Sequence, residues 1–254
     1  MRPLDFMIVG AQKSGTTALA TFLSEHPAIA MAVPKELHVF DDQRFLEPES
    51  DVWVEQSYQQ GFAGQSTEQK LLGEATPIYM YMTEIADQLA VYNPELKLIV
   101  MLRDPVDRAL SHYLMEKSRG AEYLPFMLAL MLEPFRLMRD KLPRKVGSSH
   151  RVHSYRARGL YSGQLEALYG VFPRDRVFIV YNNDLKFAHD ETLQSIFDFL
   201  GVESVNIEHR LVFAREETGP RHRLACWLLR QTFRAESRIL KQAFGINTQE
   251  WRRH

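Results

Sequence analysis

The sequence is poor in several features that would by themselves assign a class. It has a single cysteine, Cys226, so no disulfide can form within the chain. No group of Cys and His has the spacing of a zinc site, and we expect no metal. With 31 Lys and Arg against 32 Asp and Glu, the formal net charge is −1. A near-neutral chain lacks the broad positive field of a general nucleic-acid coat, so we expect no nucleic-acid partner.

Long apolar runs are also missing. No stretch approaches the ~20 residues that a membrane span needs. The segment from Met1 to Val9 is too short for a signal peptide and is typical of a strand. The 254 residues are 45% hydrophobic and 11% aromatic, which suffices for a full core. We therefore predict a soluble, cytoplasmic protein without a membrane span, built as one domain over residues 1–254.

Apolar runs and helical segments alternate along the chain. The strand candidates are residues 5–9, 96–102 and 176–181. The helical segments that follow them are residues 16–26, 105–117 and 191–200, and a further helix is predicted over residues 224–238. Asp104 and Pro105 are typical of a helix start, and Gly201 of a helix end. The alternation predicts an α/β fold around a central parallel sheet.

The first strand leads into Gly10-Ala11-Gln12-Lys13-Ser14-Gly15-Thr16-Thr17. A glycine loop between a strand and a helix turns backbone N–H groups and a helix dipole toward an anion, and so favours phosphate. Loops that bind nucleoside triphosphates read G-x-x-x-x-G-K-[ST]. Here the glycines keep that spacing, but a threonine replaces the lysine and the lysine has moved inward, to Lys13. The pattern predicts a phosphate loop whose cation is aimed differently from that of a kinase or ATPase.

A second anion site is predicted after the strand at residues 96–102. Arg103 follows that strand directly, at the edge where open α/β sheets bind ligands, and Ser111 lies two turns along the next helix. A guanidinium and a hydroxyl can bind a second phosphate group. The alternative is an ordinary ion pair for Arg103 and a structural Ser111. Gly219-Pro220-Arg221 suits another anion contact at a helix start, with a solvated surface turn as the alternative.

Glu36 and His38 are the candidates for proton transfer. In an extended chain Glu36, His38 and Phe40 share one face, which puts a carboxylate beside an imidazole. Either group can take a proton from an acceptor hydroxyl. An idle pair on a solvated loop is the alternative. The turn Glu74-Ala75-Thr76-Pro77 has a structural interpretation as well as a catalytic one.

Two further stretches bear on the acceptor. The apolar stretch Tyr123–Met138 contains Met127, Met131 and Met138, and either lines a pocket for an apolar acceptor or packs as an ordinary helix. The run from Arg136 to Arg158 is rich in basic residues, and either steers an anionic acceptor or forms a solvated loop.

Taken together, these motifs resemble those of sulfotransferases that use 3′-phosphoadenosine 5′-phosphosulfate (PAPS), above all bacterial members and heparan sulfate sulfotransferase domains. The loop at residues 10–17 looks like the family's 5′-phosphosulfate loop, and residues 35–41 are similar to its acceptor-side motif. The segment from Arg103 to Ser111 resembles its 3′-phosphate loop and helix. Gly219-Pro220-Arg221 is similar to the late loop that closes over the nucleotide.

The resemblance implies a P-loop-like, three-layer α/β/α sandwich that transfers a sulfuryl group from PAPS by in-line displacement and releases PAP without a metal. The implied acceptor is a hydroxyl or amine of a small metabolite, lipid or saccharide. Lys13 would stabilise the departing PAP. The implied nucleotide-binding residues are Lys13, Ser14, Gly15, Thr16, Thr17, Arg103, Ser111, Gly219, Pro220 and Arg221.

The resemblance also bears on the general base and on the acceptor. Heparan-type enzymes use a glutamate at the position of Glu36, whereas cytosolic small-molecule sulfotransferases use a histidine. We predict Glu36 as the base, with His38 as the alternative or as an acceptor-orienting group. Ala75 stands where heparan enzymes carry a substrate-contacting lysine, which favours a small metabolite or lipid acceptor. The competing classes are a P-loop kinase or NTPase and a catalytically silent nucleotide-binding protein of the same fold.

Overall fold

A computed structural model describes residues 2–68, 70–141, 143–210, 222–248 and 251. The chain divides into two compact units. The first unit is formed by residues 1–102 and 164–214, and the second by residues 103–163 and 215–254.

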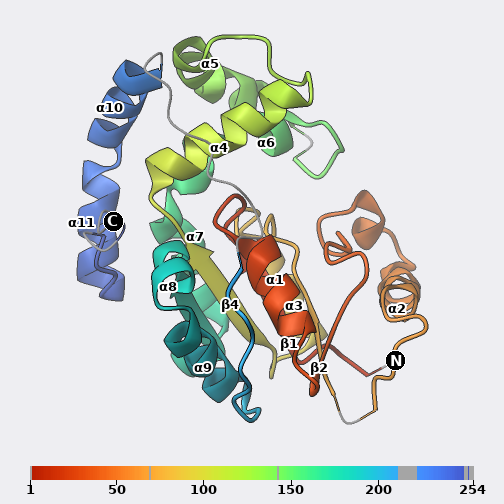
Figure 1. The fold of residues 1–254 in the computed structure, drawn as a ribbon. Coiled ribbons are helices and arrows are strands. Elements are labelled where there is room, and N and C mark those ends of the chain that lie inside the picture. Colours follow the sequence, from red (N-terminus) through yellow and green to blue (C-terminus); the bar gives the residue numbers. More distant parts are fainter. Residues whose placement is uncertain (1, 69, 142, 211–221, 249–250, 252–254) are drawn as a thin grey trace. The chain divides into compact units, whose positions relative to one another are not determined.

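The first unit contains a five-stranded sheet in which neighbouring strands are parallel, in the order β2-β3-β1-β4-β5 (Figure 1). The strands are β1 (Phe6–Gly10), β2 (Ile29–Met31), β3 (Leu71–Glu74), β4 (Lys97–Leu102) and β5 (Val177–Tyr181). After β1 the chain builds one side of the sheet with β2 and β3, and then the other side with β4 and β5. The strand order therefore reverses beside β1, and the carboxyl ends of strands at such a point are where open α/β sheets bind ligands.

Helices cover both faces of this sheet. Phe6 and Ile8 of β1 belong to one apolar cluster with Leu19 of α1 (Thr16–Ser24) and Phe197 of α9 (His189–Leu200). Successive side chains of a strand point to opposite faces, and the intervening residues of β1 are equally buried. Burial on both faces is what a parallel sheet between helical layers requires. The other helices of this unit are α2 (Ser50–Gly61), α3 (Ile85–Tyr92), α8 (Asn182–Phe187) and the greater part of α7 (Tyr161–Val171).

The second unit is helical. Its helices are α4 (Pro105–Ser118), α5 (Phe126–Arg139), α6 (Ser149–Val152), α10 (Arg223–Thr232) and α11 (Arg234–Phe244). Its core joins Val106 and Tyr113 of α4 to Phe126 of α5 and Leu229 of α10. The predicted single helix over residues 224–238 is wrong, because the backbone leaves the helical ladder at Phe233 and two helices result.

Candidate functional site

The glycine loop connects β1 to α1 through two residues with left-handed backbone. Lys13 has φ 70° and Gly15 has φ 98°. Such a conformation is uncommon for a residue with a Cβ, and it recurs at functional sites. The loop is tied to the sheet, since the Ala11 amide donates to the Met101 carbonyl at 2.7 Å. The turn is closed by the Ser14 amide, which donates to the Ala11 carbonyl at 3.1 Å.

The amino end of α1 is open to an anion. Among the described residues no side chain caps it, and its first turn contains no acidic residue. The first N–H groups of a helix have no partner within the helix, and the dipole gives them partial positive charge. The Ser14 hydroxyl oxygen is fully buried and has no hydrogen-bond partner among the described residues. A phosphate or sulfate group at this loop would satisfy donors that the protein leaves unsatisfied.

Asn182 supports this loop from a distant part of the sequence. It is the first residue of α8, immediately after β5, and its Nδ2 donates to the Ser14 carbonyl at 2.8 Å. A Cβ built on Gly15 would lie 2.6 Å from that nitrogen. Position 15 therefore requires glycine for two reasons: the backbone there is left-handed, and the Asn182 side chain leaves no room for a Cβ. Sequence reasoning missed Asn182, whose only signal is a polar side chain directly after a strand.

The substitution Gly15→Ala tests this geometry. If the loop holds the nucleotide that the resemblance implies, this change should weaken PAP binding by at least ~100-fold, because a residue with left-handed backbone would gain a Cβ 2.6 Å from the Asn182 amide nitrogen. Calorimetric titration with PAP measures the loss. Gly64→Ala is the matched control, since Gly64 also has positive φ (76°) but open space around its Cβ position. Equal PAP affinity in the two variants would show that the loop does not hold the nucleotide.

The segment at residues 35–41 brings four titratable side chains together. The Nδ1 of His38 lies 2.9 Å from Oδ2 of Asp41, and its Nε2 lies 3.4 Å from Oε2 of Glu36. Lys35 donates to the other carboxylate oxygen of Glu36. Glu36 and His38 therefore lie side by side, as predicted, although His38 has left-handed backbone (φ 54°) rather than extended backbone. Phe40 does not share their face, because it is buried among aromatic rings.

This arrangement separates the pKa values of Glu36 and His38. Burial by itself would raise the pKa of Glu36, but the hydrogen bonds from His38 and Lys35 lower it to about 2. Burial by itself would lower the pKa of His38, but the hydrogen bonds to Asp41 and Glu36 raise it to about 9. At neutral pH the site therefore contains an ionised Glu36 beside a protonated His38. Asp41, which is fully buried and holds the imidazole, was not identified from the sequence.

The turn after β3 holds this segment in place. The Ala75 amide donates to the Lys35 carbonyl at 2.9 Å, and the Tyr79 hydroxyl accepts from the Val39 amide at 2.8 Å. The Glu74 carboxyl is fully buried, and burial raises its pKa to about 8, as does the nearby Asp41 carboxylate. These contacts support the structural interpretation of the Glu74-Ala75-Thr76-Pro77 turn.

The second predicted phosphate site begins the second unit. Arg103 follows β4 directly and is half-buried, and its carbonyl accepts from the Tyr161 hydroxyl at 3.0 Å. Asp104 caps α4 as predicted, accepting from the Val106 amide at 2.8 Å. Ser111 lies on α4 and is also half-buried. Gly219, Pro220 and Arg221 lie outside the described residues.

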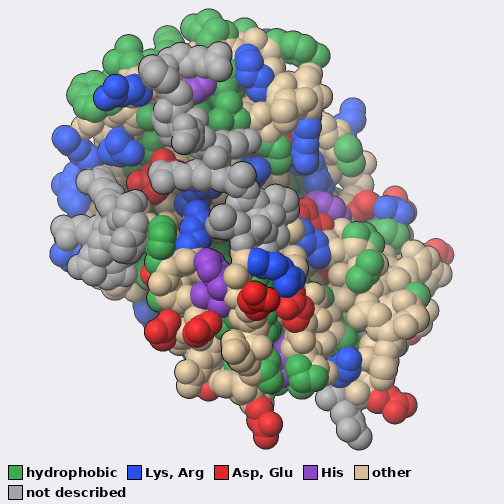
Figure 2. All heavy atoms as spheres, viewed as in Figure 1, with side chains coloured by type: hydrophobic (Ala, Val, Ile, Leu, Met, Phe, Trp, Pro, Cys, Tyr) green, Lys and Arg blue, Asp and Glu red, His purple; other side chains and the backbone are tan. Residues whose placement is uncertain are grey.

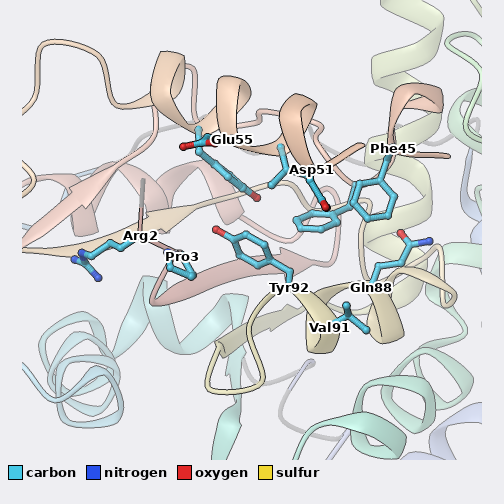
Figure 3. Close-up of a pocket in the computed structure, with 11 residues that line it drawn as sticks. Arg2, Pro3, Phe45, Asp51, Glu55, Gln88, Val91 and Tyr92 are labelled. Atoms are coloured by element: carbon cyan, nitrogen blue, oxygen red, sulfur yellow. The ribbon is translucent and has the colours of Figure 1, made fainter. Parts of the chain in front are cut away.

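A pocket of about 390 Å³ lies elsewhere in the first unit (Figure 3). Tyr92 of α3, Glu55 of α2 and the amino-terminal Arg2 and Pro3 line it. Arg2 and Pro3 precede β1, whereas the glycine loop follows that strand. Arg2 and Pro3 therefore place one side of the pocket near the amino end of β1, and Phe40 of the segment at residues 35–41 also lines it. Neither Glu36 nor His38 lines it.

A parallel sheet whose middle strand leads through a glycine loop into an uncapped helix defines the class of P-loop-like α/β proteins that bind phosphate groups. Comparison with known proteins narrows the class. The model of the sulfotransferase domain family matches residues 3–221, and the chain belongs to this family. The predicted P-loop-like fold is confirmed by solved sulfotransferase structures.

The relatives include bacterial and animal proteins. A sulfotransferase from Alicyclobacillus acidocaldarius superposes with a TM-score of 0.77 and 28% identity over 100% of both chains. Heparan sulfate glucosamine 3-O-sulfotransferase 3A1 of Mus musculus is 28% identical over 220 residues, which cover 84% of this chain and 50% of that protein. A mouse sulfotransferase complexed with PAP shares the fold, with a TM-score of 0.50 and 16% identity over 82% of this chain and 62% of that one. The chain spans about half the length, or less, of the curated relatives it matches.

Proposed function

We propose that the chain transfers a sulfuryl group from PAPS to a hydroxyl or amine of a small metabolite, lipid or saccharide. The observation that carries the proposal is the glycine loop, where the amino end of α1 has no side-chain cap and the Ser14 hydroxyl no hydrogen-bond partner within the described part of the chain. Both would accommodate a phosphosulfate group. PAPS would supply an activated sulfate whose leaving group is PAP. Membership in the sulfotransferase family supports this choice of donor. A kinase is not favoured, since Thr16 stands where a kinase loop has its lysine.

In the proposed reaction each group of residues has a separate task. Lys13, Ser14 and the amino end of α1 hold the phosphosulfate and stabilise the charge that develops on the leaving oxygen. The Glu36 carboxylate takes the proton of the acceptor hydroxyl as the acceptor oxygen bonds to sulfur. The bond from sulfur to the phosphate oxygen breaks, and its electron pair leaves with PAP. His38, held by Asp41, keeps its proton and orients Glu36 or the acceptor.

A separate set of residues is proposed for the 3′-phosphate of the nucleotide. We propose that Arg103 and Ser111, with Gly219, Pro220 and Arg221, bind this phosphate. Arg103 supports the assignment by following β4, the neighbour of β1, without an intervening residue. The two units would then form one sulfotransferase domain, and the family model, which runs through both, supports this.

The test is transfer of labelled sulfate. The purified chain is incubated with PAPS carrying ³⁵S and a panel of hydroxylated and amine-bearing metabolites, lipids and saccharides, and labelled products are identified by mass. We expect a labelled product and an equal amount of PAP. Magnesium-dependent ATP hydrolysis without sulfate transfer would instead indicate an NTPase. PAP binding without transfer to any acceptor of the panel would indicate a silent nucleotide-binding protein.

A further inference from the structure

Helix α5 of the second unit exposes its apolar side chains instead of burying them. Figure 2 shows hydrophobic side chains gathered over the part of the surface that α5 forms in Figure 1. Five large apolar residues of this helix are exposed, and together they form the α5 stripe: Leu128, Met131, Leu132, Phe135 and Met138. The first four have the spacing i, i+3, i+4 and i+7, which places them on one face of a helix. The methionine-rich stretch thus neither lines a described pocket nor packs wholly into the core.

The inner face of α5 is fixed by its own contacts. Phe126 and Ala129 pack into the core of the second unit. Glu133 is buried on the same side, where it accepts from the backbone amides of Arg156 at 2.8 Å and Ala157 at 2.7 Å. Removing the carboxylate would leave two backbone donors without their partner. Rotating the helix to bury the stripe would break both hydrogen bonds and expose Phe126 and Ala129, so these contacts keep the stripe on the surface.

The exposed charges of the segment that contains the stripe have one sign. Between residues 115 and 158 the exposed charged side chains in the described part of the chain are all basic: Lys117, Arg119, Arg139, Lys141, Lys145 and Arg156. Of the acidic residues in this segment, Glu116, Glu122 and Glu133 are buried and Asp140 is half-buried. Glu122 is paired with Arg136, and Asp140 accepts from the Ser149 amide. The whole chain has a net charge of −1, so the excess of exposed positive charge in this segment, which we call the positive rim, is local.

We propose that the α5 stripe is a docking surface for a lipid bilayer with anionic headgroups. An amphipathic helix with large apolar side chains on one face and a basic rim lies in the membrane interface, where apolar burial and attraction to anionic lipids add together. The helix would lie on the bilayer, since its 14 residues are fewer than the ~20 needed for a span. Among the described residues, no helix has both the length and the hydropathy to cross a membrane.

A second copy of the chain is a weaker candidate for the occupant. Two-fold pairing places the same patch of both copies face to face. The positive rim of one copy would then meet the positive rim of the other, and like charges at an interface oppose association. An anionic bilayer complements both the stripe and its rim. The proposal does not depend on the transfer reaction.

The experiment measures binding of the full chain to vesicles. The fraction of the chain that sediments with the vesicles is measured for vesicles of phosphatidylcholine containing ~30 mol% phosphatidylserine and for vesicles of phosphatidylcholine alone. We expect binding to the anionic vesicles, at least ~10-fold weaker binding to neutral ones, and release as salt rises toward ~0.5 M. The double variant M131Q/F135Q should bind the anionic vesicles at least ~10-fold more weakly, because it removes two of the inserted side chains.

A matched control distinguishes binding through the stripe from non-specific binding through any exposed aromatic side chain. Phe187, at the end of α8, is 61% exposed, against 60% for Phe135. Phe187→Gln should bind vesicles like the unmodified chain, and unchanged melting would show that both variants fold. Three results would overturn the proposal: no binding to anionic vesicles, equal loss in Phe187→Gln and M131Q/F135Q, or a vesicle-free dimer that only M131Q/F135Q abolishes. The last result would assign the stripe to a second copy.

Discussion

Replacing Lys13 by alanine is expected to lower kcat by at least ~1,000-fold while PAP still binds. The loop gives Lys13 a left-handed backbone beside the uncapped amino end of α1, where charge on a departing phosphate would develop. A cation that meets this charge chiefly in the transition state contributes to kcat more than to ground-state binding. Initial rates with ³⁵S-labelled PAPS give kcat, and calorimetric titration gives the affinity for PAP.

Two further variants make this test specific. Lys13→Arg retains the positive charge and should keep more activity than Lys13→Ala. Lys241→Ala removes an exposed lysine of α11 and should match the unmodified chain. If Lys13→Ala turned over PAPS at an undiminished rate, Lys13 would have no part in the chemistry. A parallel collapse of PAP affinity would instead make it a ground-state binding residue.

The second large effect is expected from Glu36→Gln, which should lower kcat by ~100- to 10,000-fold and change the KM for PAPS by less than ~3-fold. The amide cannot accept the acceptor's proton, whereas the glycine loop is unaltered. Glu55→Gln, which changes an exposed carboxylate of α2, is the control and should leave kcat unchanged. A larger loss of kcat in His38→Ala than in Glu36→Gln would transfer the role of base to the histidine.

The pH profile distinguishes the same two assignments independently. Glu36 has a pKa of about 2 and is ionised throughout the neutral range, so kcat should be nearly constant from pH 6 to about 8. His38 has a pKa of about 9 and is protonated over that range. If His38 were the base, kcat would rise about tenfold per pH unit until it levelled near pH 9. Such a rise in the unmodified enzyme would contradict the assignment of Glu36.

Much of the sheet could be predicted because its signals are local. The strand at residues 96–102 is an almost unbroken apolar run, and β4 covers Lys97–Leu102. The strands β2 and β3 were missed because one has three residues and the other ends in Gly73-Glu74, so neither shows a long run. The helix starting at Pro105 and the stop at Gly201 were correct, since a capping aspartate and a left-handed glycine determine them within a few residues.

Only those parts of the candidate site whose residues are close together in the sequence could be predicted. The glycine loop and the Glu36–His38 pair follow from residues that are near one another in the chain. Asn182 is 168 residues from Ser14, so only the folded sheet brings the two together. Asp41 belongs to the same motif, but its contact with the His38 imidazole depends on the left-handed backbone at His38. The pattern of apolar and polar residues does not predict that conformation. The roles of Arg103 and Ser111 stay predictions.

The buried Glu74 carboxyl has a thermodynamic consequence for the chain. Its pKa is about 8 in the folded state, against an ordinary value of 4.5. Between these two values folding takes up a proton at this residue, so alkali favours the unfolded chain. The contribution of the protonated Glu74 to the free energy of unfolding is complete below pH 4.5 and is lost as the pH rises through 8. The turn that anchors Lys35 thus couples the segment at residues 35–41 to the proton concentration of its surroundings.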